Sequence, residues 1–234
     1  MLITCLGVFG PYPASCGATS GYLVSSDKSL VLFDCGSGVI SRLMQFASPE
    51  DLDAVVLSHW HYDHMSDLFV LGYLLQKSGK TLPLIAPTPP EHMKNLLEEL
   101  PFELLNIENI DRIGDIKLSS SKTRHPVPCF ATKFENKGRI FVYTGDAADE
   151  SGLLPFCKDA DLILCDAAFI YSERPENAPH MSALMAAELA KKTDKAKLVL
   201  THFIPGEDLD ALLLEAVKIY KNSHLAEENK RFEV

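Results

Sequence analysis

The sequence lacks the surplus of positive charge with which proteins bind nucleic acids. Its 234 residues contain 22 Lys and Arg against 32 Asp and Glu, a formal net charge of −10. Affinity for a phosphate backbone rests on cationic side chains, so this balance argues against broad nucleic-acid binding. A small anionic substrate that is recognised locally stays compatible with the composition.

The chain also lacks three features of secreted and membrane proteins. Its six cysteines form no Cys-x-x-Cys pair, and the first residues do not show the basic and then apolar pattern of a signal peptide. No apolar run approaches the ~20 residues that span a bilayer. We therefore predict a soluble, cytoplasmic protein with reduced thiols and no membrane partner.

The chain also lacks a recognisable linker between domains. No Gly-, Ser- or Pro-rich stretch divides the chain, and it contains no tandem repeat or low-complexity tract. The apolar content of 47% suits a sizeable core. We predict one domain over residues 1–234.

Apolar runs and turn residues alternate along the chain in a way that predicts both strands and helices. The clearest predicted strands cover residues 1–7, 21–24, 30–34, 53–58, 82–86, 116–118, 129–134, 139–143, 162–165 and 198–201. Helices are predicted over residues 40–46, 66–76 with Ser66 as its N-cap, 182–192 and 208–220, and after Pro89 and Pro90. The stretch 102–144 is predicted to be a strand meander. Two sheet-rich halves that each carry helices pack best with the sheets inside and the helices outside.

Four potential metal ligands fall within six residues, directly after the predicted strand 53–58. They are His59, His61, Asp63 and His64. Imidazole and carboxylate groups form the ligand set of zinc and similar divalent ions, and this spacing suits two neighbouring metals. The alternative is a surface loop that is merely rich in histidine, which the preceding buried strand disfavours.

The run Leu57–His64 resembles the His-x-His-x-Asp-His signature of the metallo-β-lactamase superfamily. Upstream, Leu32–Gly36 is similar to the strand and Asp-x-Gly turn that precede that signature. The resemblance covers nearly the whole chain, because later ligands of the family also have matching positions at the ends of predicted strands. It implies an α/β fold, the four-layered αββα sandwich. The later matching positions are His125, Asp146 and His202.

The resemblance implies two divalent metal ions that share a bridging carboxylate and a bridging water or hydroxide. Its ligands are His59, His61 and His125 for one metal, Asp63, His64 and His202 for the other, and Asp146 between them. A carboxylate at the bridge favours a binuclear site over the mixed His and Cys sites of many β-lactamases. Zinc is the expected metal, although manganese and iron accept the same ligands.

Two kinds of supporting role follow from the expected metal site. Asp63 is well placed to orient the water or to accept its proton, which makes it a catalytic candidate as well as a ligand. Asp34 and Asp166 could fix histidine tautomers by hydrogen bonding, or could simply cap a turn or a strand end.

Within the superfamily the chain is most similar to ribonuclease Z and its short relatives, through His180–Ala187 and Leu198–Phe203. The resemblance implies that His180 donates a proton to the leaving oxygen or contacts a phosphoryl group, unless it is a surface residue at a helix N-terminus. Ribonuclease Z carries a long tRNA-binding arm between its third histidine and its bridging aspartate. Here only residues 126–145 lie between His125 and Asp146, so we do not expect extended tRNA binding.

The sequence allows two roles for several residues near the motif. Lys122 and Arg124 could bind one phosphate or be solvated loop charges. Trp60 and Tyr62 could line the pocket or pack beneath it. The loop 171–179 could border the pocket and set specificity.

These observations predict a metal-dependent hydrolase, a phosphodiesterase acting on a small phosphodiester or nucleotide. The rival enzyme class is carboxyl-ester, lactone or sulfate-ester hydrolysis, because the fold does not fix the chemistry. A third class is a diiron redox or sensing protein. The last helix and the tail to Val234 could pack internally or form a homodimer surface, so the oligomeric state stays open.

Overall fold

The strands form two sheets that face each other. The computed structural model describes residues 1–193 and 195–234. Within these residues, the first sheet runs in the order β14 (Arg231–Glu233), β1 (Leu2–Gly7), β2 (Gly21–Ser25), β3 (Leu30–Phe33), β4 (Ala54–Val56), β5 (Leu82–Ala86) and β6 (Phe102–Asn106). The second runs in the order β13 (Ser223–Leu225), β12 (Lys197–Thr201), β11 (Leu162–Asp166), β10 (Arg139–Tyr143), β9 (Phe130–Asn136), β8 (Ile116–Lys122) and β7 (Arg112–Ile113).

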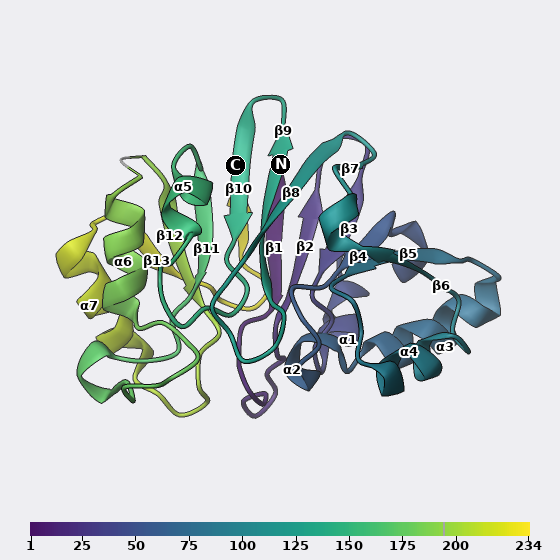
Figure 1. Cartoon of the computed structure of the whole chain (residues 1–234), viewed down its shortest axis with the longest axis horizontal. Helices are drawn as coiled ribbons and strands as arrows, with labels where there is room; N and C mark the ends of the chain where they lie inside the picture. Colours follow the sequence, from purple (N-terminus) through teal and green to yellow (C-terminus); the bar gives the residue numbers. More distant parts are fainter. Residues whose placement is uncertain (194) are drawn as a thin grey trace.

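Helices cover the outer face of each sheet (Figure 1). The first sheet carries α1 (Val39–Leu43), α3 (Leu68–Ser78) and α4 (Glu91–Leu97), with α2 (Tyr62–Met65) at its lower end in Figure 1. The second sheet carries α5 (Leu153–Cys157), α6 (Ala183–Lys191) and α7 (Leu209–Ile219). No helix among the described residues is long and apolar enough to cross a membrane. The layers confirm the predicted αββα sandwich.

Strand β3 shows how the sequence builds these layers. Successive side chains of a strand point to opposite faces of the sheet. Val31 and Phe33 accordingly join the core between the sheets, whereas Leu32 joins the core under the helices. Across the sheet interface, the ring of Phe33 packs edge-on against that of Tyr143, with centroids 4.9 Å apart. Because both faces are buried, the strand is a continuous apolar run in the sequence.

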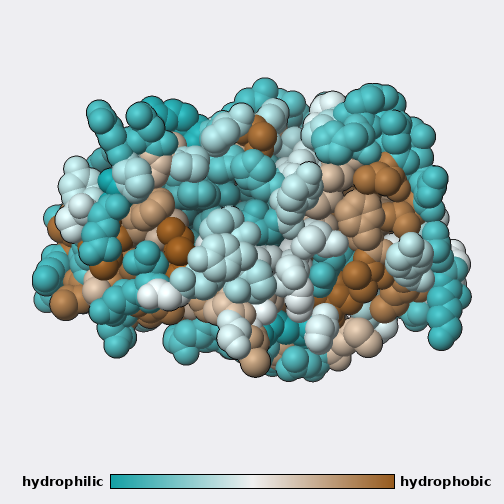
Figure 2. Space-filling view, turned by 90° about the horizontal axis from the view of Figure 1, so that it is seen from below, coloured by the Kyte–Doolittle hydropathy of each residue, from teal (hydrophilic) through white to brown (hydrophobic). Residues whose placement is uncertain are grey.

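The strands that precede the motif residues end at one edge of the molecule. Strands β3 to β6 are parallel to one another, and so are β10 to β13. Parallel strands present their carboxyl ends at one edge, where α/β sheets bind ligands. This edge lies at the bottom of Figure 1. Figure 2 looks onto it, with hydrophilic residues in the middle and more hydrophobic groups toward both ends.

The predicted meander over 102–144 is wrong in its first part. Strand β6 pairs in parallel with β5 and belongs to the first sheet. The chain then crosses through the short 3-10 helix η2 (Ile107–Asn109) to the second sheet, where β7 to β10 form the antiparallel meander. Apolar patterning predicted the strands but could not assign them to a sheet.

The predicted helix start at Ser66 is also wrong. Ser66 is instead the C-cap of the short helix α2, and α3 begins at Leu68 after Asp67. The Asp67 carboxylate accepts a hydrogen bond from the Ile40 N–H, 3.0 Å away, and so supports the start of α1 rather than its own helix.

The C-terminal tail packs internally, which settles one of the two alternatives for it. Strand β14 pairs antiparallel with β1, and Phe232 and Val234 are buried. On α7, Leu212 and Ala216 face the core while Leu214 is exposed. A homodimer stays a prediction.

Candidate metal centre

The run from His59 to His64 changes backbone conformation in its middle. His59 follows strand β4 and is fully buried, and His61 has extended backbone angles at the N-cap of α2. Asp63 and His64 then lie within the single helical turn of α2. The change from extended to helical backbone separates the four side chains into two pairs. The first pair is His59 and His61, and the second is Asp63 and His64.

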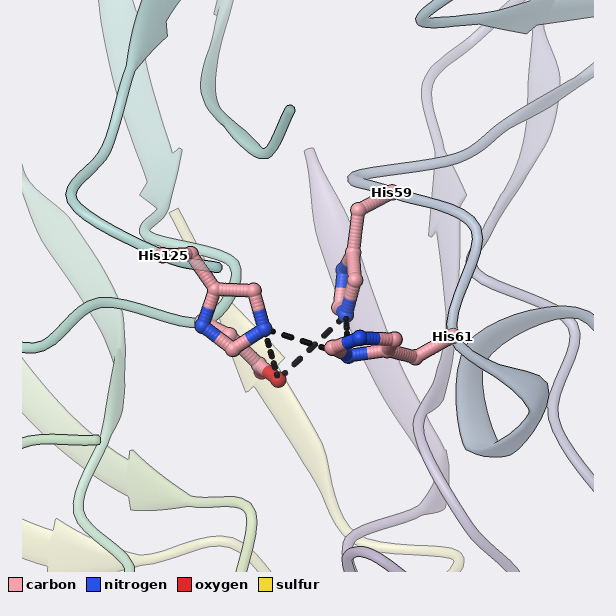
Figure 3. A group of neighbouring side chains, drawn as sticks. His59, His61 and His125 are labelled. Carbon is pink, nitrogen blue, oxygen red and sulfur yellow. Dashed lines mark hydrogen bonds and ion pairs between the residues drawn. The ribbon is translucent and has the colours of Figure 1, made fainter. Parts of the chain in front are cut away.

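The first pair meets His125 and Asp146. Nδ1 of His61 lies 2.9 Å from Nε2 of His59 and 3.1 Å from Nε2 of His125. Figure 3 shows the imidazoles of His59 and His61, from one loop, converging with that of His125 from the opposite side. Oδ2 of Asp146 lies 3.4 Å from Nε2 of His59 and 3.7 Å from Nε2 of His125. One nitrogen or oxygen from each of these four residues lies within 4.8 Å of the others.

The second pair meets His202, which follows β12. Oδ2 of Asp63 lies 3.2 Å from Nε2 of His202 and 3.6 Å from Nε2 of His64. The other oxygen of Asp146, Oδ1, lies 3.4 Å from Nε2 of His64 and 3.5 Å from Nε2 of His202. Asp146 therefore turns one carboxylate oxygen to each group, and all seven predicted side chains come together.

The chemistry of these groups fits divalent cations. Nε2 of His64 and Oδ1 of Asp146 are buried and have no hydrogen-bond partner, which is costly unless something compensates them. Burial, aided by the neighbouring His64, lowers the pKa of His59 well below 6.5, so its imidazole is the neutral form that ligates metals. Burial likewise lowers the pKa of His61 and of His125.

Asp34 fixes one histidine of the second group. Its Oδ2 lies 2.8 Å from Nδ1 of His64, which leaves Nε2 of that ring directed at the centre. Its Oδ1 accepts from the backbone N–H of Ser58 at 2.8 Å. The two alternatives considered for Asp34 are therefore not exclusive, because its carboxylate contacts both the histidine and the backbone after β4. Its positive φ of 52°, rare for a residue with a side chain, marks the tight turn that places it there.

Asp166 contacts His180 in the same way. Oδ2 of Asp166 lies 3.0 Å from Nδ1 of His180 and also accepts from the backbone N–H of Ala147 at 3.0 Å. Burial opposes protonation of His180, but the carboxylates of Asp166 and Asp146 outweigh it and raise the pKa of His180 to about 9. The ring of His180 stacks on that of His202, with centroids 4.6 Å apart.

A cavity of about 340 Å³ opens over the centre. Its lining includes His61, Asp63, His125, Asp146 and His180. His180 is thus a cavity residue rather than a solvated residue at a helix N-terminus.

The aromatic residues of the motif have different environments. Trp60 is buried in the core between the first sheet and its helices, and its Nε1 donates to the carbonyl of Pro87 at 2.8 Å. Tyr62 lines the cavity and is 68% exposed. From the predicted border loop 171–179, Pro179 lines the same cavity.

Gly10 was not identified as a site residue from the sequence. A Cβ at this position would lie 2.2 Å from Cε1 and Nε2 of the His202 imidazole. Sequence offers only the turn-rich setting of Gly10 as a signal, because the approach is between segments far apart in the chain.

Gly10→Ala is therefore expected to displace His202 and to weaken metal binding by about 10- to 100-fold, the usual cost of disturbing the support of a metal ligand. Metal content after dialysis against graded chelator measures the effect, and circular dichroism checks that the fold is retained. Unchanged affinity in a folded variant would show that the ring does not need this position.

Comparison with known proteins identifies the family. Residues 30–203 match the Beta-lactamase superfamily domain. The "Probable metallo-hydrolase YhfI" of Bacillus subtilis (strain 168) is 35% identical, over 94% of this chain and 94% of its own length. The crystal structure of the metallo-beta-lactamase fold protein YhfI from Bacillus subtilis has a TM-score of 0.94 and 31% identity, over 100% of this chain and 99% of that chain.

Two solved structures of lower identity share the fold. Human tRNase Z, short form, has a TM-score of 0.82 at 21% identity and covers 100% of this chain and 99% of its own. A diphosphatase from the PhnP family has a TM-score of 0.77 at 18% identity, over 100% and 97% of the two chains. The family implies divalent metal ions, for which the clustered histidines and aspartates are candidate ligands. The chain therefore belongs to the metallo-β-lactamase superfamily, as a metallo-hydrolase with a ribonuclease Z-like fold.

Proposed function

We propose that the protein is a hydrolase with two divalent metal ions, most simply zinc. His59, His61 and His125 would hold one ion, Asp63, His64 and His202 the other, and Asp146 would bridge them. The observation that carries this proposal is the division of the Asp146 carboxylate, with Oδ2 facing the first group and Oδ1 the second. A single-metal site would give the second oxygen no reason to face two further ligand atoms, Nε2 of His64 and Nε2 of His202.

The residues around the ions would carry the remaining chemistry. Two such ions, when bound, lower the pKa of a shared water and stabilise charge on the attacked oxygen. Asp63 would orient that water or accept its proton. Protonated His180, held through Nδ1 by Asp166 at 3.0 Å, would present its other nitrogen to the leaving oxygen as a general acid.

The proposed substrate is a small phosphodiester, such as a nucleotide. A histidine beside the centre, held through Nδ1 by Asp166, suits an alkoxide leaving group, and the cavity of about 340 Å³ suits a small molecule. Two proteins of the same fold are named a tRNase Z and a diphosphatase. Between His125 and Asp146 this chain has the hairpin β9–β10 and short loops, which supports a substrate smaller than tRNA.

A substrate screen on metal-loaded protein tests the reaction class. We expect turnover of bis(p-nitrophenyl) phosphate or cyclic nucleotides and none of acyl esters, lactones or aryl sulfates. Turnover of the esters alone would replace the phosphodiesterase proposal with the rival hydrolase class. Metal analysis with a visible spectrum tests the redox alternative, because a diiron centre absorbs and a zinc centre does not.

A further inference from the structure

A second cavity of about 200 Å³ adjoins the cavity over the metal centre. The two share His125 and Pro179, so these residues form a partition between them. The carbonyl of Pro179 lies 3.2 Å from Nδ1 of His125, which fixes the partition. A molecule bound over the metal centre would therefore reach the second cavity by extending past His125 and Pro179.

Arg174 holds the walls of the second cavity, because its guanidinium donates hydrogen bonds to backbone carbonyls. Its Nη2 donates to the carbonyls of Ala148 and Ala178, at 2.8 Å and 2.9 Å, and both alanines line the cavity. Its Nε donates to the carbonyl of His180 at 2.7 Å. One arginine thus ties the loop that carries His180 to the loop after Asp146.

Arg124 gives the second cavity a positive group. Its carbonyl accepts from the N–H of Ala148 at 2.8 Å, which fixes its backbone to the opposite wall. Its Nε lies 3.0 Å from Oδ2 of Asp149, and its side chain is 64% exposed. An arginine has further donors on its two terminal nitrogens, in a fork that matches phosphate oxygens.

Lys122 differs from Arg124 although only one residue separates them. Its Nζ lies 3.3 Å from Oε1 of Glu108, and it lines neither cavity. From the sequence, Lys122 and Arg124 were equal candidates for a phosphate contact. In the structure only Arg124 lines a cavity. Lys122 provides a matched control for Arg124.

We propose that the second cavity binds a further phosphate of the substrate, contacted by Arg124, while the reacting phosphodiester lies over the metal centre. The inference rests on the proposed function and deepens it, because it narrows the substrate class to phosphodiesters that carry a second phosphate group. The amide of Asn177, which also lines the cavity, offers a further donor for such a group.

A pair of substrates that differ by one phosphate tests the proposal. They are thymidine 5′-(p-nitrophenyl phosphate) and the same compound with a 3′-phosphate. Wild type is expected to have a KM about tenfold lower for the second compound, equivalent to 1.4 kcal/mol. Arg124→Gln should abolish that difference and leave KM for the first compound unchanged, whereas Lys122→Gln should preserve the difference. Equal losses on both substrates, or a preserved difference in Arg124→Gln, would overturn the proposal.

A binding measurement separates this proposal from the proposed function. Calorimetry with thymidine 3′,5′-bisphosphate and thymidine 5′-monophosphate needs no turnover. If wild type hydrolyses neither ester but binds the bisphosphate about tenfold more tightly, with the difference lost in Arg124→Gln, the phosphodiesterase proposal fails and the phosphate site stands. If wild type binds the two nucleotides with equal affinity, the proposal of a phosphate site is wrong, even if both esters are hydrolysed.

Discussion

Asp146→Ala is expected to leave at most one of two metal ions bound and to reduce kcat/KM roughly a thousandfold, equivalent to about 4 kcal/mol, because metal ions contribute several kcal/mol of charge stabilisation. Both carboxylate oxygens of Asp146 face ligand atoms, at 3.4 Å from His59 and 3.4 Å from His64. Its loss therefore removes a ligand from both groups at once. Elemental analysis of purified protein and steady-state kinetics measure the two effects.

Asp159→Ala is the matched control for this change, because it removes the same charge from an exposed position. It should retain both ions and the full rate. An Asp146→Ala protein that keeps two ions per chain would contradict the bridging role, whatever its activity. Loss of the fold is a separate effect, which near-UV circular dichroism detects.

The assembly of the seven side chains was expected from the resemblance to the family signature, and the structure places each of them after a strand. The motif follows β4, Asp146 follows β10 and His202 follows β12, all parallel strands within their sheets. His125 follows β8, which is antiparallel to β9 and so runs in the same direction as β10. Most of these strand ends were visible in the sequence as the limits of apolar runs. The common edge itself follows from the parallel direction of the strands, which the structure shows.

Contacts between distant segments could not be predicted in the same way. Strand β14 completes the first sheet beside β1, but its short sequence has no distinctive pattern, and its partner lies at the other end of the chain. The carbonyls that Arg174 binds are backbone groups, which every residue has, so no side-chain pattern marks them. The close approach of Gly10 to His202 likewise depends on packing alone. Such features arise from tertiary structure, which local patterns do not encode.

His180→Ala is expected to lower kcat by about 10²- to 10⁴-fold, the range for removal of a general acid, while metal content stays unchanged. The loss should depend on the leaving group. A p-nitrophenolate leaves without much protonation, so the loss should be small on bis(p-nitrophenyl) phosphate and large on a dinucleoside monophosphate, whose leaving alkoxide needs a proton. His92→Ala, at an exposed position of α4, is the control and should affect neither substrate.

The leaving-group dependence distinguishes two roles for His180, since a residue that only contacts the phosphoryl group would give equal losses on both substrates. Metal content distinguishes a third, because His180 lies close enough to Asp146 and His202 to form a ligand group with them. If His180→Ala loses metal, the residue is a ligand. Asp166→Asn should lower kcat with the same leaving-group dependence but by a smaller factor, because it removes the negative charge 3.0 Å from Nδ1 of His180 and leaves the imidazole in place.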